Sequence, residues 1–118
     1  MSRYRRAWQA LFLLLFAAIS YLALSPLPPE GLSTGWDKAN HALAFAALAF
    51  TGRFAWTRRP LPLFMALLAY GAAIELLQTQ IPNRDGDWHD LVADAVGLAL
   101  VLLLSALLQQ PAPATDRR

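Results

Sequence analysis

Ionisable side chains are concentrated in one short stretch of this otherwise apolar chain, "IELLQTQIPNRDGDWHDLVADAVG" at residues 74–97. A second polar group, made of Asp37, Lys38 and His41, opens an apolar stretch earlier in the sequence. Carboxylates and imidazoles can accept hydrogen bonds, transfer protons or coordinate metal ions, whereas lysine and arginine bind anionic groups. These residue types therefore allow ligand binding, acid–base catalysis or metal coordination.

The spacing of these residues groups them on helix faces, because residues three and four apart are neighbours on a helix. Asp37 and Lys38 precede His41 by four and three residues, Glu75 and Gln78 are three apart, and Asp90 and Asp94 are four apart. The candidate ligand-binding residues are Asp37, Lys38, His41, Glu75, Gln78, Arg84, Asp90 and Asp94.

The elements that position these groups are four apolar runs in a chain of 118 residues, 57% hydrophobic and only 15% charged. Soluble domains usually have about 25% charged residues. The runs are continuous and lack the alternation of a transmembrane barrel, so they predict helices. The sequence predicts an all-α, four-helix transmembrane bundle in one domain over residues 1–110, with a disordered cytoplasmic tail at 111–118. The expected helices are about 7–24, 38–55, 61–79 and 89–108.

Two of the runs leave alternatives open. Spanning a bilayer takes about 20 residues, and the second run reaches that length only if Asp37, Lys38 and His41 form its first turn near the interface. The first run follows Arg3, Arg5 and Arg6 and could be a signal peptide, but "AISYLALS" offers no clean cleavage site.

Basic residues predict the orientation, because Lys and Arg accumulate in cytoplasmic loops. Eight of the ten lie at the termini or between the second and third runs, and only Lys38 and Arg84 lie on the other side. Both termini are therefore expected in the cytoplasm, with the polar residues at the outer side. This distribution makes the basic residues topological anchors, so we expect no nucleic-acid partner.

Structural explanations compete with functional ones for several of these residues. Asp37 and Asp90 can stabilise the positive ends of helices, and Asp85 and Asp87 suit a solvated turn around Gly86. Glu75 and Asp94 fall inside apolar helices. An ionisable residue there is costly and usually marks a functional site, with interhelical hydrogen bonding as the structural alternative.

The motifs "WDKANHALAFAALAF", "ELLQ", an Arg after a Pro in the outer loop, and "DWHDLVADAVG" resemble the VanZ-like family of small bacterial membrane proteins. The resemblance covers about residues 36–98 and implies a multi-pass protein of the bacterial cytoplasmic membrane. Its founding member is associated with low-level resistance to teicoplanin. The matching motif positions are Asp37, Lys38, His41, Glu75, Gln78, Arg84 and Asp90. Position 94 departs from the family, which often has Asn where this chain has Asp94.

The leading hypothesis is a non-enzymatic membrane protein with a polar pocket at the outer leaflet. This pocket would bind an envelope lipid, a cell-wall precursor or a lipoglycopeptide, with Lys38 and Arg84 on anionic groups and the carboxylates and Gln78 on hydroxyls, amides or amines. The alternative is an intramembrane enzyme acting on a lipid-linked substrate, with His41 as general base or acid and Glu75 as a carboxyl group whose acidity is changed by burial.

The residues give less support to two further alternatives, a metal site and a transporter. A divalent metal could be held by His41, Glu75, Asp90 and Asp94, but no tight motif such as His-Glu-x-x-His occurs, so the sequence predicts no metal and no cofactor. A proton-coupled transporter would need more than four helices unless the chain dimerises, and its acidic groups would line a midplane path. The oligomeric state, a homo-oligomer included, stays open.

Overall fold

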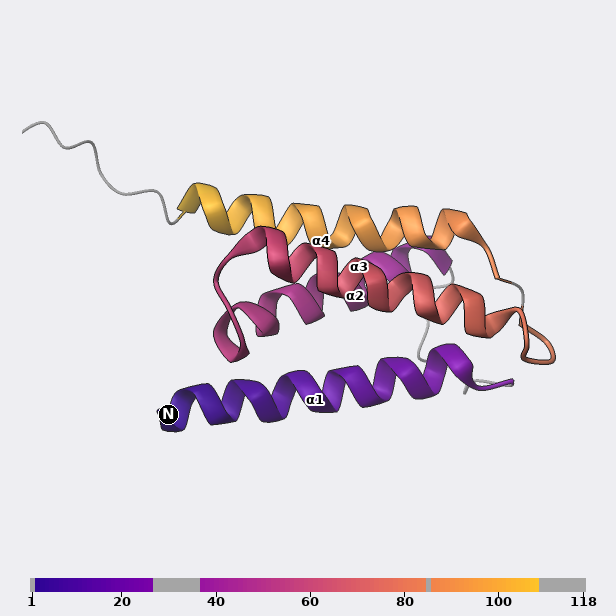
Figure 1. Ribbon diagram of the computed structural model, residues 1–118, viewed down its shortest axis with the longest axis horizontal. Helices are drawn as coiled ribbons and strands as arrows, with labels where there is room; N and C mark the ends of the chain where they lie inside the picture. The colour runs from indigo at the N-terminus through magenta and orange to yellow at the C-terminus, as the bar shows by residue number, and fades with distance from the viewer. Residues whose placement is uncertain (1, 27–36, 85, 109–118) are drawn as a thin grey trace, which may run out of the picture.

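Four α-helices that run lengthwise beside one another form the fold (Figure 1). The computed structural model describes residues 2–26, 37–84 and 86–108, without the side chain of Asp37. The helices are α1 (Arg3–Leu24), α2 (Asp37–Ala55), α3 (Pro60–Gln78) and α4 (Trp88–Leu108). The all-helical expectation is confirmed, whereas the tail expected at 111–118 lies outside the described residues.

The helix boundaries follow local signals. α1 begins at Arg3, four residues before its apolar run, because the Ser2 side chain accepts a hydrogen bond from the Arg5 N–H at 3.0 Å and caps the helix. α3 begins with Pro60, whose missing N–H is harmless in the first turn. The bounds of α2, α3 and α4 lie within one residue of those expected.

In the described part of the chain, α1, α3 and α4 are long and apolar enough to cross a membrane. Each also carries large apolar side chains exposed on the bundle surface, such as Leu14, Met65 and Leu103. Water-soluble monomers rarely expose large contiguous apolar patches, so the three apolar helices indicate a membrane protein.

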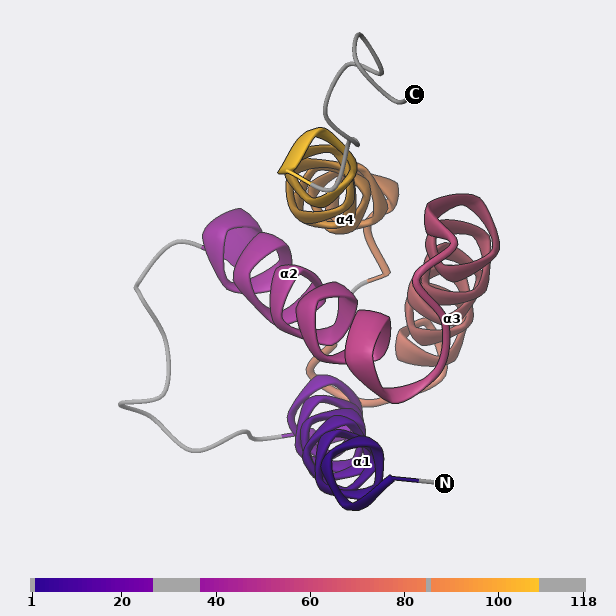
Figure 2. The same ribbon diagram turned by 90° about the vertical axis from the view of Figure 1, so that its left-hand side faces the viewer.

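α2 is not among these three helices, because Asp37, Lys38 and Arg53 reduce its apolar length. It lies at the centre of the bundle, between α4, α3 and α1 (Figure 2), and it contacts all three. Phe45, Leu48 and Ala49 are almost completely buried. α2 keeps some exposed apolar side chains, such as Leu43 and Phe50, but a helix that packs against three others needs a smaller apolar face toward lipid, so its lower hydrophobicity suits its place.

The core joins all four helices through apolar side chains. Phe12 of α1, Phe45 and Leu48 of α2, Leu67 of α3 and Leu98 of α4 belong to one buried cluster. The start of α1 and the end of α4 lie at the same end of the bundle (Figure 1). The opposite end therefore carries the end of α1, the start of α2, the end of α3 and the start of α4, which are the segments that hold the candidate residues.

Candidate functional site

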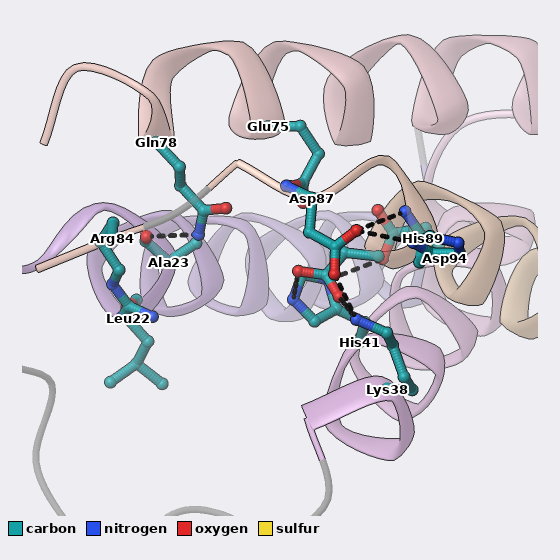
Figure 3. Close-up of polar contacts among 11 residues, drawn as sticks. Leu22, Ala23, Lys38, His41, Glu75, Gln78, Arg84, Asp87, His89 and Asp94 are labelled. Carbon is teal, nitrogen blue, oxygen red and sulfur yellow. Dashed lines mark hydrogen bonds and ion pairs between the residues drawn. The ribbon is translucent and has the colours of Figure 1, made fainter.

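Polar side chains from three helices and one loop meet at this end of the bundle (Figure 3). We call the following set the polar cluster: Lys38 and His41 of α2, Glu75 of α3, Asp87 of the loop before α4, and Asp90 and Asp94 of α4. Asp90, Asp94 and Glu75 are buried, with 4%, 1% and 8% of their surfaces exposed. The cluster thus runs from a partly exposed rim into the bundle interior.

Lys38 joins the rim to the interior. Its Nζ donates to Asp87 Oδ2 at 2.9 Å and also to Asp90 Oδ1. The side chains of Lys38 and Asp87 are 32% and 39% exposed, whereas that of Asp90 is 6% exposed. The hydrogen bond from Lys38, followed by those from the backbone and ring N–H groups of His89, lowers the pKa of Asp87 well below its ordinary value. Asp87 therefore remains a carboxylate at neutral pH.

His41 lies between two carboxylates of α4. Its Nδ1 is 3.0 Å from Asp94 Oδ1, and its Nε2 is 3.3 Å from Asp90 Oδ2. One helical turn separates Asp90 from Asp94, so both carboxylates reach the same imidazole ring. A carboxylate at each ring nitrogen holds the orientation of the ring, and the tautomer sets which nitrogen donates.

Close helix packing brings Asp94 to this ring. A Cβ added to Gly97 would lie 2.1 Å from the backbone oxygen of Ala42, so only glycine permits this approach of α4 to α2. A Cβ added to Gly71 would lie 2.6 Å from Asp94 Oδ2. The two glycines therefore admit the Asp94 side chain between α2 and α3, where small residues permit close contact of membrane helices.

Glu75 supplies the carboxylate of α3. Its Oε2 accepts a hydrogen bond from the Asp87 N–H at 2.8 Å, which ties the loop to the helix. Its Oε1 is buried and has no hydrogen-bond partner among the residues that the structure describes. Leaving a buried acceptor unsatisfied costs about 1–3 kcal/mol. Buried acceptors without a partner are rare in folded proteins, so this oxygen is a candidate contact for a further donor or a cation.

Gln78 and Arg84 lie beside the polar cluster and bind α1 (Figure 3). Gln78 Nε2 donates to the Ala23 carbonyl at 2.8 Å. Arg84 Nε donates to the Ser25 carbonyl at 2.8 Å, and its Nη2 donates to the Leu22 carbonyl. The last carbonyls of a helix lack partners within the helix, so Arg84 and Gln78 cap α1.

The structure therefore divides the eight candidate residues. It brings Lys38, His41, Glu75, Asp90 and Asp94 together. It places Gln78 one turn away with its Oε1 buried and without a partner in the described part of the chain. Arg84 caps α1 and is not part of the cluster, and Asp37 is the first residue of α2, with its side chain outside the described residues.

Asp87 belongs to the cluster although its sequence context indicated only a solvated turn. Its Oδ1 accepts from the backbone N–H of His89 at 2.9 Å, the bond that an N-cap residue makes at the start of a helix. An Asp directly before an apolar helix is a recognisable N-cap signal. The capping role could be read from the sequence, whereas the second role, holding Lys38, depends on the tertiary structure.

The cluster has an excess of negative groups. Among the described residues, four carboxylates meet one lysine and one histidine. Three of these residues, His41, Glu75 and Asp90, each offer one ligand atom, and these atoms lie within 4.8 Å of one another. The arrangement can bind hydrogen-bond donors, amines or a metal ion. An unpaired anionic head group would be repelled.

Comparisons of this chain with protein-family models, with curated proteins and with solved structures find no match. The geometry of the cluster and the residues themselves are therefore the basis for inferring its function.

Proposed function

We propose that this membrane protein binds the polar head of an amphipathic envelope molecule at the outer face of the bacterial cytoplasmic membrane. The candidates are an envelope lipid, a cell-wall precursor and a lipoglycopeptide antibiotic. All four helices cross the membrane in this proposal, with both termini in the cytoplasm, as the distribution of basic residues predicts. The resemblance to the VanZ-like family supports the same location and includes glycopeptide susceptibility among the effects to test.

The observation that carries the proposal is the pair of buried, unsatisfied acceptors at one end of the bundle. Glu75 Oε1 and Gln78 Oε1 have no partner among the described residues. Lys38 and Arg84, which the sequence assigned to anionic groups, already bond to groups of the protein itself. The ligand contacts therefore fall to acceptors, which bind the hydroxyl, amide or amine groups of a sugar or peptide head.

Access to these acceptors passes the ion pair at the rim. Lys38 and Asp87 are each about one-third exposed, and exposed ion pairs contribute only about 0–1 kcal/mol. Asp87 also donates its N–H to Glu75, so displacement of this loop residue uncovers the Glu75 carboxylate. Acyl chains of the ligand would lie against the exposed apolar surfaces of the neighbouring helices.

The direct test is lipid retention by the purified full-length protein. We expect the parent to retain an envelope lipid through detergent extraction and washing, detected by mass spectrometry. Glu75→Gln replaces an acceptor oxygen by a donor and should reduce retention at least tenfold. The control is Gln80→Ala, a change at an exposed position of the loop between α3 and α4. This variant should retain as much lipid as the parent. Equal retention by Glu75→Gln and the parent would show that the polar cluster does not bind the head group.

Teicoplanin susceptibility tests whether the ligand is a lipoglycopeptide antibiotic. The host should be Gram-positive, because an outer membrane excludes glycopeptides. Expression of the parent should raise the inhibitory concentration, whereas Glu75→Gln and His41→Ala, matched in membrane level by immunoblot, should not. Equal protection by all three would refute a role of the cluster in this phenotype. No protection by any of them would remove the antibiotic from the candidates and leave the lipid and the precursor.

The second candidate function is an intramembrane enzyme acting on a lipid-linked substrate. The observation in its favour is the Asp94–His41 contact at 3.0 Å, since a histidine oriented by a buried carboxylate is a common general base. This candidate differs from the first in that the lipid is changed. A product that forms on incubation of the parent with lipid extract, and that His41→Ala does not form, would identify it.

A further inference from the structure

The geometry points to a divalent transition-metal site in the polar cluster, with His41, Glu75 and Asp90 as ligands and Asp94 as the positioning residue for His41. This inference deepens the proposed function, because it assigns the cation that such an acidic site uses to hold a head group. The metal binding itself depends only on the geometry of the cluster.

The first argument is the ligand set. One imidazole and two carboxylates come from α2, α3 and α4, and their ligand atoms lie within 4.8 Å of one another. Zinc bonds to His nitrogen and carboxylate oxygen at about 2.0–2.2 Å, so small side-chain movements would close these atoms around one ion. Three protein ligands leave a fourth position, as in sites where zinc binds a further molecule.

The second argument is the orientation of His41. A histidine that binds a metal usually donates its other ring N–H to a carboxylate, which fixes the tautomer and directs the free nitrogen at the ion. Asp94 Oδ1 lies 3.0 Å from Nδ1, and the Asp94 side chain is 1% exposed. Nε2 lies on the other side of the ring, 3.3 Å from Asp90 Oδ2, where the ion would lie.

The third argument is independent of the acidic charge and concerns Glu75. The residue is 92% buried, and its Oε1 has no hydrogen-bond partner in the described residues while Oε2 accepts from the Asp87 N–H. A metal ligand needs one such oxygen. A bound cation would satisfy Oε1, and a hydrogen bond to the other oxygen is the usual support for a ligating carboxylate.

Charge balance agrees with this assignment. Among the side chains that the structure describes, four carboxylates against Lys38 leave three net negative charges when His41 is neutral. A dication reduces this excess to one negative charge. Its open position would attract a phosphate oxygen or another anionic atom of a lipid-linked head group, which the cluster without a cation would repel. The bound metal thus extends the proposed ligands to phosphate-bearing heads.

Metal binding by the full-length protein, purified in detergent without a histidine tag and stripped with a chelator, tests the inference. Titration with Zn²⁺ should show one site per chain, and Mg²⁺ should bind far more weakly, because imidazole favours zinc over magnesium. Glu75→Gln and His41→Gln should each abolish the site. His89→Gln removes the chain's other histidine, whose side chain is 60% exposed and outside the cluster, and should leave Zn²⁺ affinity unchanged.

Asp94→Asn gives the sharper result, because Asp94 does not touch the ion. Loss of such a supporting group typically weakens metal affinity about 10–100-fold. We expect a fall in this range while the metal-free variant unfolds at the same temperature as the metal-free parent. Unchanged Zn²⁺ affinity in Asp94→Asn or Glu75→Gln, or Mg²⁺ binding as tight as Zn²⁺ binding, would overturn the assignment.

Lipid retention, measured on the same samples, separates this inference from the proposed function. A parent that retains lipid but takes up no Zn²⁺ refutes the metal site and leaves the proposed function standing. A parent that binds Zn²⁺ but retains no lipid, with or without the ion, refutes the proposed function and leaves the metal site standing.

Discussion

At the scale of single residues, the polar end of the bundle contains two kinds of residue: those that face one another in the polar cluster, and those that cap α1. His41, Glu75, Asp90 and Asp94 face one another, whereas Arg84 turns to the carbonyls of α1. A guanidinium with several fixed donors suits the unsatisfied carbonyls at a helix end, and its positive charge is favourable there. Arg84 therefore stabilises the position of α1 without contributing to the polar cluster.

Replacement of Arg84 tests this division. Arg84→Ala should lower the free energy of unfolding by about 2 kcal/mol, because hydrogen bonds to charged groups contribute about 1.5–3 kcal/mol. Lipid retention and Zn²⁺ affinity should stay at parental values in the folded protein. Thermal unfolding in detergent gives the stability, with the exposed Arg59→Ala as control. Normal stability together with lost retention would place Arg84 in the binding site instead.

At the scale of elements, the contact of α2 with α4 decides where the cluster forms. α4 approaches α2 so closely at Gly97 that a Cβ there would lie 2.1 Å from the Ala42 oxygen and 2.9 Å from its carbonyl carbon. Ala42 follows His41 directly, so this contact also fixes the height of the imidazole relative to Asp94. The helix packing and the site geometry therefore share one determinant.

Gly97→Ala should destabilise the bundle by about 1–3 kcal/mol, the usual cost of an overpacked contact. The direction of this change in stability is informative, because alanine has a helix propensity about 1 kcal/mol better than glycine. Without the close contact, the substitution would stabilise the helix. Zn²⁺ affinity should fall as α4 moves away from α2. The control is Ala99→Val, which adds a larger group at an exposed position of the same helix. A Gly97→Ala protein as stable as the parent would disprove the close contact.

At the scale of the whole molecule, four helices that reverse direction from one to the next place both described ends of the chain at one end of the bundle and the polar cluster at the other (Figure 1). Three of the four helices can cross a membrane by length and composition. The predicted orientation has the end with Arg3, Arg5 and Arg6 in the cytoplasm, because flanking basic residues stay there.

Cysteine labelling tests this orientation directly, since the chain has no cysteine of its own. A membrane-impermeant maleimide added to intact spheroplasts should label Gln80→Cys, near the polar cluster, and should not label Ser2→Cys until the membrane is permeabilised. Labelling of both positions, or of neither, in intact spheroplasts would mean that one of the first three helices does not cross the membrane. The reverse pattern would place the polar cluster in the cytoplasm.

The sequence by itself determined the helices and the end of the bundle that carries the polar residues. Long apolar runs can satisfy their backbone groups in a bilayer only as helices, and the breaks between the runs contain Pro and Gly. Placement of Lys38, His41, Glu75, Asp90 and Asp94 at one height followed from their positions near helix ends. These are local properties, so spacing along the chain was sufficient.

Only the tertiary structure decided which polar groups contact one another. Asp94 and Asp90 both contact His41, and Asp87 forms an ion pair with Lys38. Arg84 donates to a carbonyl at the end of α1 and lies outside the cluster. These partners depend on the rotation and separation of helices that are far apart in sequence, which the close contacts at Gly97 and Gly71 fix. A ligand set drawn from three helices has no fixed spacing along the chain. For this reason the sequence showed no metal motif, whereas the folded chain brings His41, Glu75 and Asp90 within reach of one ion.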